Sequence, residues 1–280
     1  MSDPVVTLGV LRLDGVDDSG VRWKMPGGGL TGWWGSPAPR FSSDPRPRAH
    51  GVWVGESWLG ARTIGVECWI IGPDRASTLA AVNALTAACS LTDTTMAVED
   101  SLVLSATVRR SDDVMVSWTN PTAAKVSLQM LARDPRLLGT LLSASTGLPS
   151  TTGGLAVPFT LPTSIAASVV SGQVSLTNPG TIDGPVMLRI DGPTSGPVVT
   201  HVTSGRQLVF ASSLVLAAGE FVTVDMERHE VLAQGVASRN GWVTSRGWSA
   251  FEPGDNTWAF TQSGAAAGGL LTVSAVPAWM

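Results

Sequence analysis

The chain has 280 residues and a mass of 29.0 kDa, and a chain of that length predicts two domains that each bury a core. Hydrophobic residues make up 44% and charged residues only 14%, which excludes disorder over most of the length. The net charge is −4 and no basic run is longer than Arg109–Arg110, so we expect no nucleic-acid partner.

The first strong pattern in chain order predicts a strand over 62–71. Four of its residues share one face by period two: Ile64, Val66, Cys68 and Ile70. Gly72-Pro73 ends this strand. A helix is expected over about 74–89, with Asp74 or Ser77 as its N-cap. Its expected apolar stripe is Leu79, Val82, Leu85 or Thr86, and Cys89.

Three alternating runs follow the helix and predict antiparallel strands of one sheet, over 102–108, 114–118 and 126–130. Asp134-Pro135 ends the last run, because proline donates no ladder hydrogen bond. The stretch 138–158 has no clear period and is expected to connect two domains. We therefore predict an N-terminal β-domain with one helix over 1–137 and a second domain over 138–280.

The second half predicts a β-sandwich, because many short alternating runs are joined by Gly- and Pro-containing turns without an amphipathic helix. Alternation makes Trp258 and Phe260 a core pair. This half carries only 13 charges (five Arg, four Asp and four Glu) in 143 residues. A surface so poor in charge suits packing against other subunits.

Other features indicate where the chain is made. The start carries no cationic segment leading into an apolar stretch, so no secretion signal is expected. No membrane span is expected either, because the most apolar stretch, 155–170, is broken by Pro158 and Pro162. Cys68 and Cys89 are too few for a disulfide framework, which suits assembly in a reducing host cytoplasm.

Motifs for catalysis or cofactor binding are weak. Gly27 to Gly32 matches G-x-G-x-x-G but follows Met25-Pro26 rather than a buried strand, which favours a loop over a nucleotide site. Ser57 with His50 nearby lacks the strand-turn-helix context of a hydrolase nucleophile. The three histidines stand far apart and form no metal-ligand spacing. We expect no catalytic residue, no cofactor and no metal.

Tryptophan is the unusual feature of the composition, with 11 Trp and no Tyr. Large aromatic side chains in loops are favoured anchors of protein interfaces. The candidate subunit-interface residues are Trp33, Trp34, Trp53 and Trp58, with a core position equally open for the first two. If the second domain bound a glycan, the candidate contacts are Trp242 and Trp248.

The order of these elements and several segments resemble the distal tail proteins of long-tailed bacteriophages, also classed as minor tail proteins. In the second half the similar segments are Val174–Thr181, Gly184–Pro193, Thr203–Leu208, Leu216–Glu220, Val224–Met226, Ser249–Asn256 and Pro277–Trp279. In the first half they run from His50 through Ile64 to the helix and then over Arg133–Arg136. Residues 15–49 depart from the family pattern, so the role of the Pro- and Trp-rich loop at 23–49 is not implied.

The resemblance implies a structural virion protein rather than an enzyme. It implies a ring-forming N-terminal β-domain, which builds a hexamer at the end of the tail tube, and a galectin-like or carbohydrate-module-like C-terminal sandwich. The implied partners are other copies of the chain, the tail tube protein, and tip proteins such as tail fibres or tail-associated lysins. The implied location is the baseplate region at the virion's tail tip. Two alternatives stay open: a carbohydrate-binding module, and a hydrolase with Ser57 and His50.

Overall fold

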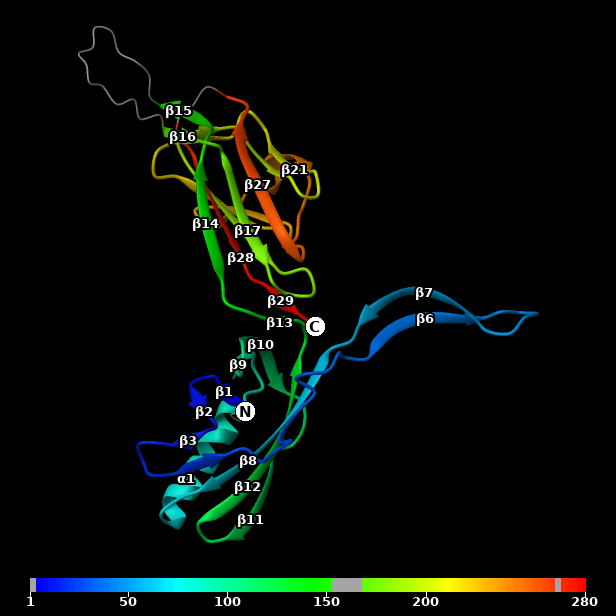
Figure 1. Ribbon diagram of the computed structural model, residues 1–280, viewed down its shortest axis with the longest axis vertical. Coiled ribbons are helices and arrows are strands. Elements are labelled where there is room, and N and C mark those ends of the chain that lie inside the picture. Colours follow the sequence, from blue (N-terminus) through cyan, green and yellow to red (C-terminus); the bar gives the residue numbers. More distant parts are fainter. Residues whose placement is uncertain (1–3, 153–167, 265–267) are drawn as a thin grey trace, which may run out of the picture. The chain divides into compact units, whose positions relative to one another are not determined.

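The computed structural model describes residues 4–152, 168–264 and 268–280, and the chain divides into two compact units, 1–139 and 140–279. Figure 1 shows a mainly β molecule, and the described residues contain a single α-helix. This confirms the predicted fold class. Most of the apolar stretch 155–170 lies outside the described residues. No helix in the described part of the chain is long and apolar enough to cross a membrane.

The first unit is built on one antiparallel sheet, and its longest pairing joins β8 to β12 over ten residues each. The strand order is β2-β1-β9-β10-β12-β8-β4-β3, with β5 beside β8, β11 beside β12 and β13 beside β10. The elements are β1 Val5–Leu8, β2 Leu11–Arg12, β3 Gly15–Val16, β4 Arg22–Lys24, β5 Leu30–Thr31, β6 Pro39–Pro45, β7 Val52–Leu59, β8 Arg62–Ile71, α1 Arg75–Ala88, β9 Thr94–Glu99, β10 Val103–Arg110, β11 Met115–Asn120, β12 Ala123–Ala132 and β13 Leu137–Leu138.

The period-two pattern of β8 sets which side of the sheet is buried. Ile64, Val66, Cys68 and Ile70 are at most 3% exposed, as predicted from their alternation. Asp74 is the N-cap of α1, because its carboxylate accepts the Ser77 amide at 2.8 Å. The helix buries Thr78, Ala81, Val82 and Leu85. The expected place of Leu79 in the apolar stripe was wrong: the helix is turned so that Leu79 is 43% exposed.

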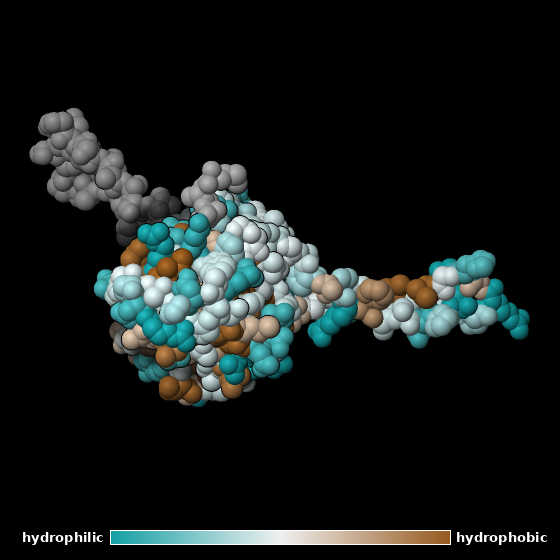
Figure 2. All heavy atoms as spheres, turned by 90° about the horizontal axis from the view of Figure 1, so that it is seen from below, coloured by the Kyte–Doolittle hydropathy of each residue, from teal (hydrophilic) through white to brown (hydrophobic). Residues whose placement is uncertain are grey.

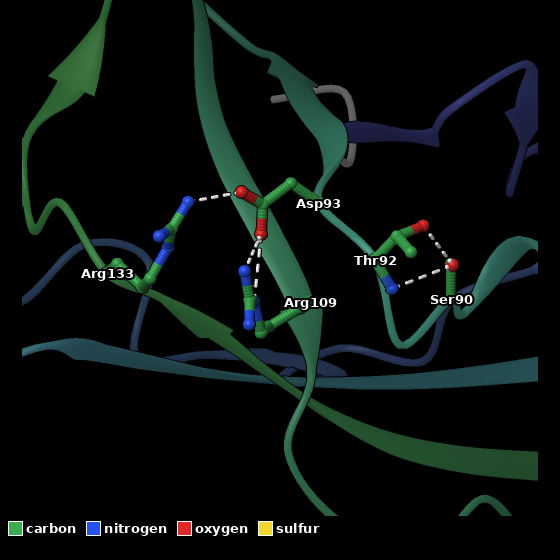
Figure 3. A network of polar contacts seen from close by, with 5 residues as sticks. All are labelled: Ser90, Thr92, Asp93, Arg109 and Arg133. Carbon is green, nitrogen blue, oxygen red and sulfur yellow. Dashed lines mark hydrogen bonds and ion pairs between the residues drawn. The ribbon is translucent and has the colours of Figure 1, made fainter.

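A carboxylate shared by two arginines ties the connection after α1 to the sheet (Figure 3). Asp93 Oδ1 accepts hydrogen bonds from Arg109 on β10, from Nε at 2.8 Å and Nη2 at 2.5 Å, and Oδ2 accepts one from Arg133 just beyond β12. The hydrogen bond from Arg109 is the main cause that holds the pKa of Asp93 below its ordinary value. On the same connection, Ser90 Oγ accepts the Thr92 amide at 3.0 Å. These contacts hold the start of β9 in register with β10.

The second unit is a β-sandwich of two antiparallel sheets, with orders β14-β28-β18-β23-β24-β25 and β17-β27-β20-β21-β26. Smaller two-stranded sheets join β15 to β16 and β19 to β22. The elements are β14 Leu142–Gly147, β15 Ser150–Thr152, β16 Ser168–Val170, β17 Gln173–Asn178, β18 Val186–Asp191, β19 Thr194–Ser195, β20 Pro197–His201, β21 Arg206–Phe210, β22 Val215–Leu216, β23 Phe221–Asp225, β24 Glu230–Ala233, β25 Ala237–Ser238, the 3₁₀ turn η1 Asn240–Trp242, β26 Val243–Arg246, β27 Gly254–Gln262, β28 Leu270–Ala275 and β29 Ala278–Trp279.

The inner faces of both sheets form one hydrophobic core, which includes Leu188, Val224 and Val273 from one sheet and Phe210 from the other. Trp258 and Phe260 on β27 are fully buried, as their alternation predicted. The stretch 138–158 is not simply a connection, because 142–147 form β14 at the edge of a sheet, paired with β28. Residues 153–158 of that stretch lie outside the described residues.

A buried histidine lies in the second unit. His201 is 1% exposed; its Nδ1 lies 2.6 Å from Ser204 Oγ, its Nε2 lies 3.1 Å from Asn256 Oδ1, and its ring lies against Trp258. Burial lowers the pKa of His201 because the charged imidazolium loses its solvation. The unfolded chain therefore binds a proton at a higher pH than the folded chain does.

We expect the stability of the second unit to be complete above about pH 6.5, the unfolded pKa of histidine, and to fall as pH decreases toward the folded pKa of His201. One extra proton on the unfolded chain gives a slope of at most about 1.4 kcal/mol per pH unit. Urea unfolding between pH 8 and pH 5 measures the free energy of unfolding of the native chain and of His201→Gln. The difference in this free energy between the two proteins at pH 8 reports packing lost in the variant. If the free energy of the variant fell as steeply with decreasing pH as that of the native chain, the role of His201 would be contradicted.

Candidate interaction surface

An arm formed by residues 39–59 leaves the first unit as a two-stranded hairpin of β6 and β7 (Figure 1). Every residue of β6 is exposed, and so is every residue of β7 except half-buried Leu59. Five large apolar side chains of the arm stand 47 to 63% exposed: Phe41, Val52, Trp53, Val54 and Trp58. Figure 2 shows this apolar surface in brown along the shaft of the arm, which extends to the right.

A hairpin with exposed apolar side chains is poorly suited to stand alone in water. A two-stranded hairpin is marginally stable in water without a further strand or helix on one face. Exposed apolar residues are common singly, but a contiguous group marks an interaction site. The arm therefore has the character of a segment that is covered by a partner.

A β-bulge decides which side chains of the arm lie together. Arg40 pairs with Trp58 and Asp44 pairs with Trp53, so a step of four residues along β6 matches a step of five along β7. Strict alternation would put Trp53 and Trp58 on opposite faces, and the extra residue, at Gly55–Glu56, brings both to one face. We call this the Trp face. The opposite face carries Phe41, Val52 and Val54.

The Trp face of the arm also carries arginine side chains. The guanidinium carbon of Arg46 lies 4.6 Å from the centroid of the Trp53 ring. Arg40 stands on the same face, across from Trp58. Arg48 follows in the turn between the two strands. Asp44 shares this face, across from Trp53. Over the whole arm, three arginines (Arg40, Arg46 and Arg48) outnumber two acidic residues (Asp44 and Glu56).

Arg62 anchors the root of the arm. Its side chain is buried, and Nη1 donates to the carbonyls of Gly32 at 3.0 Å, Trp33 at 2.7 Å and Gly35 at 2.5 Å. Its Nε donates to the Pro135 carbonyl at 2.8 Å. Burial lowers the pKa of Arg62, yet an arginine stays protonated at physiological pH. One charged side chain thus fixes the loop that precedes the arm.

The four tryptophans proposed as interface residues from the sequence fall into two groups. Trp33 is 1% exposed and lies in the core of the first unit, so the structure selects the core position for it. Trp34, beside it, is 57% exposed. Trp53 and Trp58 share the Trp face of the arm at 63 and 61% exposure. Three of the four are thus available to a partner.

The sequence motifs weighed for catalysis and cofactor binding lie in structural contexts that do not suit those roles. The glycine-rich segment 27–32 runs into strand β5 and not into a helix, and a Cβ at Gly32 would lie 2.0 Å from the Thr63 carbonyl. Close backbone packing therefore explains that glycine. Ser57 lies opposite Phe41 on the arm. Five strand residues, roughly 17 Å, separate Ser57 from Val52, and His50 lies beyond Val52 in the turn. No group of three metal-ligating side chains occurs within the described ranges.

The tryptophans proposed for glycan contact are partly covered by their own chain. Trp248 is half-buried and stacks on His229, with ring centroids 4.7 Å apart. Trp242 is 37% exposed, and the guanidinium carbon of Arg239 lies 5.1 Å from its ring centroid. A sugar platform needs a free aromatic face, and Trp242 is the better of these two candidates.

No protein-family profile matches the sequence, and no curated protein matches it. Among solved structures, the chain is similar over 100% of both chains to the Dit protein (gp 19.1) of phage SPP1, described as a paradigm of the hub adsorption apparatus in phages that infect Gram-positive bacteria, with a TM-score of 0.68 and 12% identity. Chains of the phage P2 baseplate in its activated conformation match at TM-scores of 0.45 and 0.46, with 10% identity and 97% coverage of both chains. Only the first of these likenesses is strong enough to show the fold, and the chain has that fold along its whole length.

Proposed function

We propose that this chain is a distal tail protein of a long-tailed phage, a structural component of the tail tip. The observation that carries the proposal is the full-length fold likeness to the SPP1 Dit protein at a TM-score of 0.68. A fold alone does not define a function, so the surface of this chain has to agree with the role. The surface feature that agrees is the arm.

In this role the first unit forms a ring, and six copies are the expected number. A ring needs a heterologous contact, in which one surface of a copy meets a different surface of the next. The arm supplies a protruding donor surface of that kind, with Trp53 and Trp58 as anchors. Trp-centred clusters provide most of the binding energy in many protein interfaces. Each contact of a stable ring is expected to bury well over ~1,000 Å².

The ring would join the tail tube protein on one side to the host-recognition or lytic tip proteins on the other. The role is architectural and not catalytic. The separation of Ser57 from His50 along the arm supports this part of the proposal, because a nucleophile and its base must lie within hydrogen-bond reach. The chain would be made in the host cytoplasm and would end in the virion.

Electron microscopy of the purified chain tests the proposal. Class averages are expected to contain rings with a central opening and six-fold symmetry. Particles without an opening at every concentration, or open filaments alone, would contradict it. The matched control is a chain in which residues 40–58 are replaced by a short Gly-Ser linker, which is expected to give no rings.

Glycan binding by the second unit remains a separate candidate function, which rests on the 37% exposure of Trp242. The partial cover of both candidate rings by Arg239 and His229 favours the architectural role. We therefore expect no specific signal on an array of bacterial surface glycans. A signal that Trp242→Ala removes, and that the arm-deleted chain retains, would establish the glycan-binding function instead.

A further inference from the structure

A groove on the first unit lies between α1 and the segment from β2 to β4. Its volume is about 510 Å³. The residues that shape it are Leu11, Val21 and Trp23 on the strand side and Ala76, Ala80 and Ala84 on the helix side. We call it the α1 groove. Pockets that hold small organic groups span roughly 300–1,000 Å³, so the α1 groove has room for an indole ring.

The walls of the α1 groove suit a flat apolar group. Ala76, Ala80 and Ala84 follow at intervals of four residues and are exposed, so a ring placed on them reaches close to the helix backbone. Buried Trp23 and Val21 form the opposite wall.

The mouth of the α1 groove is acidic. Asp17 lines it, and exposed Asp18 is the next residue. Asp17 Oδ2 accepts the indole N–H of Trp23 at 2.9 Å, which fixes the carboxylate at the lip. The cations of β4, Arg22 and Lys24, flank Trp23 in sequence and therefore project from the other side of the strand.

The arm cannot fill the α1 groove of its own chain. The arm enters the sheet at Arg62, whereas the groove lies at the far end of β8, where Trp23 pairs with Ile70. Eight residues of strand, roughly 26 Å, separate these two points. Figure 1 shows the arm pointing away from α1. An arm and a groove at opposite ends of one unit meet only between copies, head to tail.

We propose that the α1 groove of one copy receives the Trp face of the arm of the next copy. This inference rests on the proposed ring and names the surface that accepts the arm. Both partners are apolar at the centre. Their net charges are opposite, because the arm carries one more arginine than acidic residues and the groove has Asp17 and Asp18 at its mouth. Because donor and acceptor surfaces differ, the contact repeats from copy to copy, and it closes into a ring when the rotation between copies divides a full turn.

Cross-linking of the full chain tests this contact. A double variant, Ser42→Cys with Ala80→Cys, places one thiol on the Trp face, between Arg40 and Asp44, and one in the groove. The native thiols do not compete, because Cys68 and Cys89 are buried. A short bismaleimide is expected to give a ladder of covalent dimers and larger species. Each single variant is expected to stay uncross-linked.

The matched control moves the arm thiol to the other face. Ser57 pairs with Phe41, so the pair Ser57→Cys with Ala80→Cys should give at least tenfold less cross-linked product than the Ser42 pair. Equal yields, or no ladder from the Ser42 pair, would overturn the groove assignment. Native mass of the unmodified chain is read in parallel. An assembled chain without the ladder refutes the groove alone, whereas a single-chain mass refutes the ring.

A substitution that fills the groove gives an independent test. Ala80→Trp occupies the site with the chain's own indole and is expected to weaken association at least tenfold. Leu79→Trp is the control, because Leu79 is exposed on the same helix but does not line the groove. Circular dichroism establishes that both variants are folded. Unimpaired association of Ala80→Trp would contradict the proposal.

Discussion

A chain with Trp53→Ser and Trp58→Ser is expected to fold normally and to lose its self-association. Both side chains are more than 60% exposed, so their removal leaves the cores of both units intact. A central tryptophan of an interface contributes at least about 2 kcal/mol, so the two together weaken association by roughly a thousandfold. Native mass against concentration measures the change.

The control for this double variant is Trp242→Ser, which removes an exposed tryptophan from the second unit. It is expected to assemble like the native chain. Unfolding midpoints should agree among the three proteins. If the double arm variant associates as tightly as the native chain does, the arm is not the self-association surface.

Arg62→Met is expected to cause the largest loss of stability in the first unit, at least about 3 kcal/mol. Methionine fills a similar volume but donates no hydrogen bond. The carbonyls of Gly32, Trp33, Gly35 and Pro135 would then lose a charged donor, and a hydrogen bond to a charged group contributes about 1.5–3 kcal/mol. The bond to the Trp33 carbonyl is buried, so its loss leaves that acceptor unsatisfied. Urea unfolding followed by tryptophan fluorescence measures the loss.

Arg133→Met is the matched control. The side chain of Arg133 is 66% exposed, and its ion pair is with the surface carboxylate of Asp93 (Figure 3). Its unfolding midpoint is expected to stay close to that of the native chain. Arg62→Met is also expected to weaken assembly, since the loop at the root of the arm loses its anchor. A midpoint for Arg62→Met equal to that of Arg133→Met would refute the anchoring role.

The sequence predicts elements whose two faces have different environments. β8 and β27 each bury one face, so alternation places Ile64 to Ile70 and the Trp258–Phe260 pair in the core. The helix was predicted for the same reason, through its period and the cap at Asp74. Its rotation was less well predicted, because Leu79 was expected in the apolar stripe and is exposed.

The arm could not be predicted in the same way. It is apolar on both faces, so β7 has no period-two contrast, and the bulge at Gly55–Glu56 breaks its alternation. Pro39 and Pro45 at the ends of β6 are typical of turns. A usable signal was the run Val52-Trp53-Val54, three strong strand formers directly after Gly51. The position of Trp33 was equally hidden, since Arg62, which binds its carbonyl, lies 29 residues away.

The proposed assembly is a ring in which copies of this chain associate head to tail through the arm. Native mass across a concentration series distinguishes such a ring from a single chain. A species of six times 29.0 kDa is expected, and it should disappear when the arm is removed. A mass of one chain at every concentration, or a two-chain species that survives removal of the arm, would contradict it.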